Sequence, residues 1–218
     1  MEDIKAAIEN LGLGAAFADL DDACLQKVRQ YAVLLWLKNQ QMNLTRHTTW
    51  EQFVTRDLLD TVELSGLVPA GSEVLDVGTG GGVPGLLLAI LRPDLKLTLT
   101  DSVGKKAAAL GEFATALELD VDIYNERAET VLEDLRFDVT IARAVGPLVK
   151  ICRWFEGHWP SVGRLLATKG PKWPEELEQA NESGLTTGIE VTRLKEYATP
   201  GTEWKSVILE LRVRPETS

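Results

Sequence analysis

The stretch EVLDVGTGGGVPG, residues 73–85, decides the fold. A short apolar strand, Val74 to Val77, runs directly into the glycine-rich segment Gly78 to Gly82. Glycines let a backbone adopt positive φ and approach a ligand more closely than a β-carbon would allow. An apolar helical segment, Gly85 to Leu91, follows at once. A strand, a glycine loop and a helix in this order predict a nucleotide-cofactor fold whose ligand lies over the helix N-terminus.

Strand and helix patterns continue to alternate on the C-terminal side of this loop. Such alternation predicts a Rossmann-like α/β fold, a mostly parallel sheet covered by helices. The last two strand patterns alternate apolar and polar residues, which predicts an antiparallel pair at one sheet edge. Strands are expected at 73–77, 96–100, 121–124, 137–142, 163–168, 188–197 and 204–212, and helices at 84–91, 104–118, 128–133, 147–155 and 174–181.

Residues 1–70 carry helical periodicity only. Their apolar residues predict helices over 4–11, 23–41 and 49–64. Three helices of this size would bury too little surface to be stable alone. We therefore expect an N-terminal helical extension, residues 1–70, packed on a Rossmann-like domain, residues 71–218, in one compact unit.

Composition limits the partners and the cellular setting. A net charge of −10 argues against general electrostatic attraction to nucleic acid, although residues 140–172 carry six basic side chains against one acidic. No apolar run reaches the ~18 residues that a membrane span requires, and the N-terminus lacks signal-peptide features. Cys24 and Cys152 form no metal-binding spacing. We expect a cytoplasmic protein without a membrane span, a disulfide framework or a metal site.

Two carboxylates near the loop discriminate between nucleotide cofactors. Asp76, two residues before Gly78, would oppose a pyrophosphate but favour the ammonium and sulfonium groups of S-adenosylmethionine. Asp101 ends the next strand, where an acid can accept hydrogen bonds from ribose hydroxyls; it could also cap the following helix. The Gly-x-Gly-Gly-Gly loop lacks the third glycine of a dinucleotide loop. Together these features favour S-adenosylmethionine.

Four segments occur together in this chain: LDVGTGGGVPG, LRPDLKLTLTDSVGKK, IARA at 141–144 and ATKG at 167–170. They resemble the bacterial RsmG (GidB) methyltransferases, over roughly residues 25–172. The resemblance implies a class I S-adenosylmethionine-dependent methyltransferase that methylates N7 of a guanine in 16S rRNA near the decoding region, giving 7-methylguanosine. Its partner is then 16S rRNA or the small ribosomal subunit, and we expect a monomer.

The resemblance also implies site residues. One position departs from the family, because Asp57 stands where a histidine is common. The family's cofactor positions and the loop residues argued above give an expected cofactor site of Asp76, Gly78, Gly80, Gly82, Val83, Asp101, Ala128, Glu129 and Arg143. The expected substrate contacts are Asn43, Thr45, Lys105, Arg143 and Lys169.

Methylation of guanine N7 requires few catalytic groups from the protein. Guanine N7 carries no proton and is already a nucleophile, so its methylation needs positioning and no general base. We therefore expect no catalytic acid or base. Arg143 would contact the substrate or the cofactor carboxylate, or instead form a salt bridge to a loop acid. Trp36, Trp154 and Trp159 are interpreted as packing residues, any of which could stack on a base.

Three alternative functions remain open from the residues alone. One is a methyltransferase that acts on another RNA or on a small molecule. Another is a nucleotide-dependent oxidoreductase, which would bind a dinucleotide tightly. The third is a regulator that binds S-adenosylmethionine without transferring its methyl group.

Overall fold

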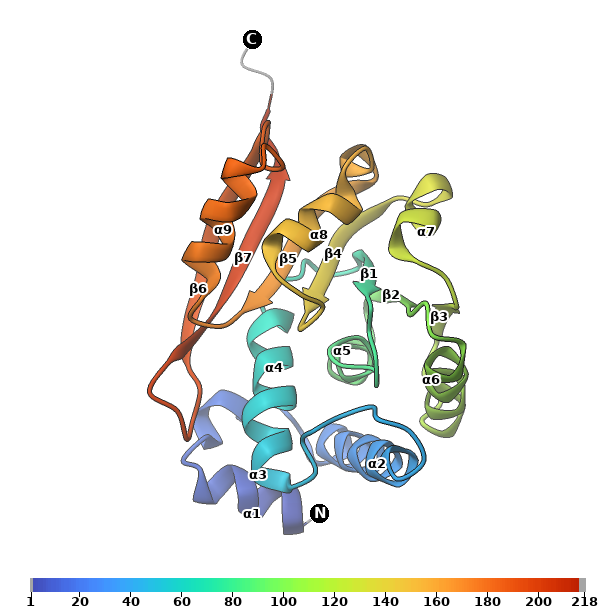
Figure 1. The fold of residues 1–218 in the computed structure, drawn as a ribbon. Coiled ribbons are helices and arrows are strands. Elements are labelled where there is room, and N and C mark those ends of the chain that lie inside the picture. The colour runs from blue at the N-terminus through green and yellow to red at the C-terminus, as the bar shows by residue number, and fades with distance from the viewer. Residues whose placement is uncertain (1, 216–218) are drawn as a thin grey trace.

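The computed structural model of the chain describes residues 2–215 (Figure 1). Its centre is a seven-stranded sheet in the order β3-β2-β1-β4-β5-β7-β6. The strands are β1 (Glu73–Val77), β2 (Lys96–Thr100), β3 (Val121–Tyr124), β4 (Phe137–Arg143), β5 (Val162–Lys169), β6 (Ile189–Ala198) and β7 (Lys205–Val213).

The strand directions follow the predicted scheme. Strands β1 to β5 pair in parallel, and β7 runs antiparallel to both β5 and β6. The strand order reverses at β1, which lies between β2 and β4. In open α/β sheets, ligands bind at such a reversal, beyond the carboxyl ends of the strands. The Rossmann-like class is thus confirmed.

Helices cover both faces of the sheet. Successive side chains of a strand point to opposite faces, and in β5 Leu165 and Ala167 join one apolar cluster while Leu166 joins the other. Residues of α7, α8 and α9 belong to the cluster that contains Leu165. Residues of α5, α6 and the N-terminal helices belong to the cluster that contains Leu166. The helical elements are α1 (Glu2–Asn10), η1 (Gly14–Phe17), α2 (Asp22–Asn39), α3 (Trp50–Gln52), η2 (Phe53–Leu58), α4 (Leu59–Ser65), α5 (Gly85–Leu91), α6 (Gly104–Ala116), α7 (Ala128–Asp134), α8 (Leu148–Phe155), η3 (Trp159–Ser161) and α9 (Trp173–Glu182).

The N-terminal helices form a second layer outside α5. Helix α2 packs on α5 and α6, and α4 packs on α5 and β5 (Figure 1). Tyr31 and Leu35 of α2 are fully buried in the same cluster as Leu86 of α5. The hydroxyl of Tyr31 donates a hydrogen bond of 2.9 Å to the carbonyl of Gly81 in the glycine loop. The extension therefore shares its core with the sheet, and a domain boundary near residue 70 stays a prediction.

The expected helix over 49–64 is interrupted. Residues 53–58 form a π-helix, η2, between the short α3 and α4. A π-helical segment differs from an α-helix only in its i→i+5 hydrogen bonds and lasts a single turn, which is too short for hydrophobic periodicity to reveal. Such π-helical segments are frequent at functional sites, and this one carries Asp57.

The expected helix 104–118 ends earlier, at Ala116, before Glu118 adopts a φ of 51°.

Within residues 2–215, no helix has the length and apolar character needed to cross a bilayer. The same residues contain no cluster of three or more His, Cys, Asp or Glu side chains arranged to hold a metal ion. Cys24 and Cys152 are free thiols.

Candidate functional site

Three clefts lie in a row at the carboxyl ends of the strands, with volumes of about 280, 460 and 230 Å³. Gly78 lines both the first and the second, and Arg143 and Ala144 line both the second and the third. They therefore form one trough. We name them by one lining residue each: the Asp101 cleft, the Gly80 cleft and the Trp204 cleft.

A larger groove of about 680 Å³ lies at the opposite edge of the sheet. It is lined by the first residues of β2 and β3, Lys96 and Val121, and by none of the predicted site residues. Ligands of this fold bind at the carboxyl ends of the strands, so we place the candidate site in the trough despite the greater volume elsewhere.

In the Asp101 cleft, the Asp101 carboxylate ties the glycine loop to the end of β2. Its Oδ2 accepts a hydrogen bond from the backbone N–H of Gly80 at 3.0 Å, and its Oδ1 accepts one from Val103 at 2.8 Å. Asp101 does not cap α6, because the capping position is Val103. Ala128 and Glu129, at the start of α7, line the same cleft. With Gly78, four predicted cofactor residues thus line this one cleft.

The Gly80 cleft follows the glycine loop. Gly78 and Gly80 have φ of 65° and 61°, a conformation that residues with a β-carbon rarely adopt. Gly81 serves packing, because a Cβ there would come within 2.8 Å of Leu35 Cδ1. Val83 also lines this cleft. Gly82 lines none of the three clefts, and a Cβ on it would meet Leu86 at 2.6 Å. Its contribution is therefore to the packing of the loop on α5.

Asp76 lies beneath the glycine loop and lines none of the three clefts. It is 1 % exposed, and its Oδ2 accepts a hydrogen bond from the backbone N–H of Gly85 at 2.8 Å. Burial raises the pKa of this carboxyl from 3.8 to about 6. The arrangement assigns Asp76 at least a supporting role, namely holding the start of α5 against β1.

A buried carboxylate oxygen without a hydrogen-bond partner lies in the Gly80 cleft, namely Oδ2 of Asp57, a residue 2 % exposed. Asp76 and Thr79 are also buried, and a hydrogen bond from the Thr79 hydroxyl favours the charged form of Asp76. Buried polar atoms are almost always satisfied, so the unpartnered Asp57 oxygen needs a reason. Thr79 and Asp57 both line the Gly80 cleft. A ligand that carries hydrogen-bond donors or a positive charge fits this cleft better than an anion does.

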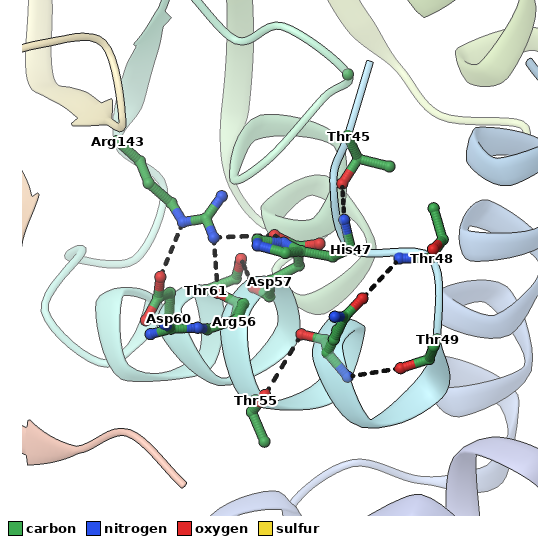
Figure 2. A network of polar contacts seen from close by, with 12 residues as sticks. Thr45, His47, Thr48, Thr49, Thr55, Arg56, Asp57, Asp60, Thr61 and Arg143 are labelled. Atoms are coloured by element: carbon green, nitrogen blue, oxygen red, sulfur yellow. Dashed lines mark hydrogen bonds and ion pairs between the residues drawn. The ribbon is translucent and has the colours of Figure 1, made fainter. Parts of the chain in front are cut away.

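Arg143 lines both the Gly80 cleft and the Trp204 cleft. Figure 2 shows its contacts with Asp57, Asp60 and Arg56. Its Nε donates to Asp60 Oδ2 and its Nη2 donates to Asp57 Oδ1, both at 2.9 Å. Nη2 also donates to the backbone carbonyl of Arg56 at 2.7 Å. Burial favours the neutral form, but the two carboxylates raise the pKa of Arg143 above its ordinary value. The salt bridge to acids is thus present, while Nη1 makes no hydrogen bond to the described residues.

Two further side chains complete this network. His47 Nδ1 lies 2.9 Å from Asp57 Oδ1, and the Tyr197 hydroxyl donates to Asp60 Oδ1 at 2.7 Å. Burial and then the charge of Asp60 raise the pKa of Tyr197 above its ordinary value. His47 comes from the chain segment that precedes α3 and packs against Asp57. We call this set, Arg143 with Asp57, Asp60, His47 and Tyr197, the Arg143 network.

The predicted substrate residues of the extension differ in position. Thr45 lines the Gly80 cleft, and its Oγ1 accepts a hydrogen bond from the backbone N–H of His47 at 2.9 Å. The carbonyl of His47 accepts another from Trp36 Nε1 at 2.7 Å. Thr45 and Trp36 therefore position His47. Asn43 is exposed and lines none of the three clefts.

The two lysines among the predicted substrate contacts also differ in position. Lys169 is 9 % exposed, and its Nζ lies 2.5 Å from Glu176 Oε2 and donates to the carbonyl of Gly146. Its charge is thus already balanced. Lys105 is exposed and lines none of the three clefts, whereas its neighbour Lys106 lines the Gly80 cleft. Arg143 and Lys169 are paired with acids, so their charges are not free to contribute to a basic face.

Some of the tryptophans pack against other aromatic rings, and others line the clefts of the trough. Trp36 packs edge-on against Trp50 at 4.7 Å between ring centroids, and Trp159 packs on Phe155 at 5.5 Å. Trp154 lines the Asp101 cleft. Trp204, which the sequence patterns did not single out, is 46 % exposed and lines the cleft named after it. No motif surrounds Trp204, so only its position in the fold draws attention to it.

Comparison with known proteins identifies the family. Residues 24–204 match the GidB family, described as rRNA small subunit methyltransferase G. The chain belongs to the GidB family. The ribosomal RNA small subunit methyltransferase G of Rhodopirellula baltica is 48 % identical over 89 % of this chain and 82 % of its own length. That of Roseiflexus sp. is 35 % identical over 90 % and 86 %. The GidB resemblance seen in the motifs is thus confirmed.

Solved structures support the fold of this GidB member. The ribosomal protein L11 methylase of Lactobacillus delbrueckii subsp. bulgaricus has a TM-score of 0.51 at 18 % identity, covering 71 % of this chain and 79 % of that one. A 16S rRNA methyltransferase of T. thermophilus, solved with AdoMet and guanosine, has a TM-score of 0.53 at 19 % identity, covering 73 % and 43 %. At these identities the likeness shows the class I methyltransferase fold alone.

Proposed function

We propose that this GidB family member transfers a methyl group from S-adenosylmethionine to N7 of a guanine in 16S rRNA. The observation that carries the proposal is the continuity of the trough. The Asp101 cleft and the Gly80 cleft meet at Gly78, and the Gly80 cleft meets the Trp204 cleft at Arg143. A cofactor and an acceptor base can therefore lie in adjoining parts of one site.

The residues fit S-adenosylmethionine. Asp101 lies where a carboxylate can accept hydrogen bonds from ribose hydroxyls, with Ala128 and Glu129 in the same cleft for the adenosine half. The unpartnered carboxylate oxygen of Asp57 in the Gly80 cleft favours the cationic methionine half and would disfavour a pyrophosphate. Bound S-adenosylmethionine would supply a methyl group on a positively charged sulfur. The proposed cofactor set is the one expected from the sequence, with Asp76 supporting the loop from beneath and Gly82 packing it on α5.

The acceptor side fits a reaction without a general base. Guanine N7 needs to be held in line with the methyl group and protected from water, and the product carries a positive charge. Asp57 lines the Gly80 cleft with one oxygen unpartnered, so its negative charge would favour that product. The other carboxylate oxygen of Asp57, Oδ1, accepts a hydrogen bond from Arg143 and lies 2.9 Å from His47 Nδ1. We propose that Arg143 orients these groups and that Thr45 supports them.

Methyl transfer to rRNA tests the proposal. The protein would be incubated with S-adenosylmethionine labelled in the methyl group and with small ribosomal subunits, or protein-free 16S rRNA, from cells that lack this methylation. We expect label in 7-methylguanosine after nuclease digestion and chromatography. Label in a different nucleoside would contradict the proposed acceptor.

Binding measurements, combined with the transfer assay, distinguish the alternative functions. Calorimetric binding of S-adenosylmethionine without transfer to either RNA would favour a regulator or a methyltransferase of another substrate. Binding of a dinucleotide and not of S-adenosylmethionine would favour an oxidoreductase. We also propose that the protein acts as a monomer in the cytoplasm, for which light scattering should give a mass near 24.0 kDa.

A further inference from the structure

Trp204 is exposed to solvent and lines one end of the trough. It is 46 % exposed, and it is the one aromatic residue among the exposed large hydrophobic residues of the described part of the chain. The other members of that set are aliphatic: Leu37, Val103, Leu135, Leu194 and Val213. An indole left in water at the edge of a cleft is available for stacking on a flat ring.

The turn that carries Trp204 is held by its own hydrogen bonds. It joins β6 to β7 (Figure 1). The Thr202 hydroxyl donates to the carbonyl of Thr199 at 2.7 Å and lies 3.1 Å from the carbonyl oxygen of Trp204. Thr199, 1 % exposed, is joined to Ser206 by a hydroxyl contact of 2.9 Å. The indole is therefore presented from an ordered turn, which reduces the entropy lost when a ligand stacks on it.

Arg56 lies over the Trp204 ring, with its guanidinium carbon 5.9 Å from the ring centroid. Within the described residues, the Arg56 side chain forms no ion pair with an acid. The other two cations that line this cleft, Arg143 and Lys169, are each paired with carboxylates. Arg56 is thus the cation of the Trp204 cleft whose charge remains available to a phosphate.

The position of Trp204 also distinguishes it from the acceptor site. The glycine loop lines the Asp101 and Gly80 clefts, whereas Trp204 lines only the third cleft, on the other side of Arg143. A base next to the methyl donor would lie in the Gly80 cleft. A base on Trp204 would then belong to a neighbouring nucleotide of the same RNA.

We propose that Trp204 and Arg56 form a nucleotide-binding subsite for substrate RNA, in which the indole stacks on an unpaired base flanking the acceptor guanine and the guanidinium contacts a phosphate. This inference rests on the proposed RNA substrate. A protein with a net charge of −10 gains little affinity from general electrostatics, so stacking supplies attraction that its surface charge does not.

The test measures equilibrium binding of wild-type protein and variants to protein-free, unmethylated 16S rRNA and to unmethylated small subunits. Trp204→Ala should weaken rRNA binding about tenfold, and Trp204→Phe, which keeps a flat ring, by about threefold or less. Val213→Ala removes an exposed apolar group at the opposite end of β7 and should leave binding unchanged. S-adenosylmethionine affinity and the melting temperature should be unchanged in all three variants.

The salt dependence tests the role of Arg56 separately. Arg56→Gln should reduce the slope of log affinity against log salt concentration by about one, whereas Trp204→Ala should leave the slope unchanged. Only the backbone carbonyl of Arg56 serves the Arg143 network, so this substitution spares that network.

The outcomes separate this inference from the proposed function. If the wild-type protein binds rRNA and Trp204→Ala binds it equally well, the subsite is overturned. The methyltransferase proposal is then left intact. A loss seen with small subunits but not with protein-free rRNA would indicate a protein partner and would also overturn the subsite. If the wild-type protein neither binds nor methylates rRNA, both proposals fail.

Discussion

The two ends of the trough are built in different ways. At the Asp101 end, every hydrogen-bond partner of Asp101 lies within 24 positions of it in the chain. At the Arg143 end, the partners of Arg143 are 83 to 87 positions away, and Tyr197 reaches Asp60 across 137. The first end is a short-range motif of strand, loop and strand. The second exists only after the extension and the edge strands have packed on the sheet.

The two ends also differ in their chemistry. Asp101 accepts hydrogen bonds from backbone N–H groups, which any sequence supplies once the loop has formed. The Arg143 network instead buries an arginine between two carboxylates, so each member depends on the others. Substitutions at the Asp101 end should therefore reduce ligand affinity, whereas substitutions at the Arg143 end should first reduce stability.

The largest expected effect tests the Arg143 end. Arg143→Met leaves Asp57 and Asp60 buried without their cation and should lower the free energy of unfolding by about 3–5 kcal/mol. Chemical denaturation measures this change. Adding Asp57→Asn and Asp60→Asn to Arg143→Met should recover part of the loss. A loss below about 1 kcal/mol for Arg143→Met would show that the network does not hold the fold together.

The second prediction concerns Asp76, which lies between the two ends. Because burial raises its pKa from 3.8 to about 6, the folded state keeps a proton that the unfolded state releases within this range. Wild-type stability should therefore fall relative to Asp76→Asn from about pH 4 to pH 6, by about 3 kcal/mol in total, and the difference should then level off. Denaturation curves at several pH values measure it. A difference independent of pH would contradict the raised pKa.

The third prediction addresses the Asp101 end. Asp101→Ala removes the carboxylate proposed to accept from ribose and frees the N–H of Gly80, so S-adenosylmethionine affinity should fall about 10- to 100-fold. Titration calorimetry measures the affinity, and circular dichroism should show the fold retained. Asp101→Asn, which keeps one acceptor oxygen, should be intermediate. Unchanged affinity in Asp101→Ala would remove this residue from the cofactor site.

A matched pair of smaller changes compares the two ends directly. Tyr31→Phe and Tyr197→Phe each remove one buried hydroxyl and should each lower stability by about 1 kcal/mol. Tyr31 holds the glycine loop through Gly81, so its loss should also weaken S-adenosylmethionine binding by a few-fold. Tyr197 holds Asp60, so its loss should leave that affinity unchanged. Equal effects on cofactor binding would break the distinction between the ends.

The smallest expected effect concerns His47. Its ring contacts Asp57 at the Gly80 cleft, an arrangement that could serve a general base. Methylation of guanine N7 needs no base, so His47→Ala should change the single-turnover methylation rate by about threefold or less. A rate reduced by about 100-fold or more, and restored at high pH, would instead indicate an acceptor that must lose a proton.

The sequence was most informative where the relevant contacts are short in range. The mostly parallel sheet and its antiparallel edge pair follow from patterns within residues 73–213, whereas the strand order comes from the structure. Asp101 was expected from its strand end and Ala128 and Glu129 from the resemblance, and the three line one cleft. The resemblance then predicted the family, which the comparisons confirm. The roles of these residues toward a cofactor remain predictions that the calorimetry above would decide.

The sequence patterns were least informative for polar and charged residues whose partners and exposure are set by the fold. Lys169 looks like a free cation in the sequence, but in the fold Glu176 neutralises it. Asn43 and Lys105 were expected to contact substrate, yet they line none of the three clefts of the trough. Trp204 lies beyond the motifs and becomes significant only because Arg56 faces its ring.

The sequence by itself determined the class of fold, the glycine loop and the acid at the end of β2. Local backbone freedom and strand periodicity are properties of neighbouring residues, so they can be read along the chain. Only the tertiary structure decided that Arg143 would be shared between Asp57 and Asp60, with His47 and Tyr197 beside them. The energy of a buried charge depends on what surrounds it in space, and residues more than 80 positions apart supply those surroundings here.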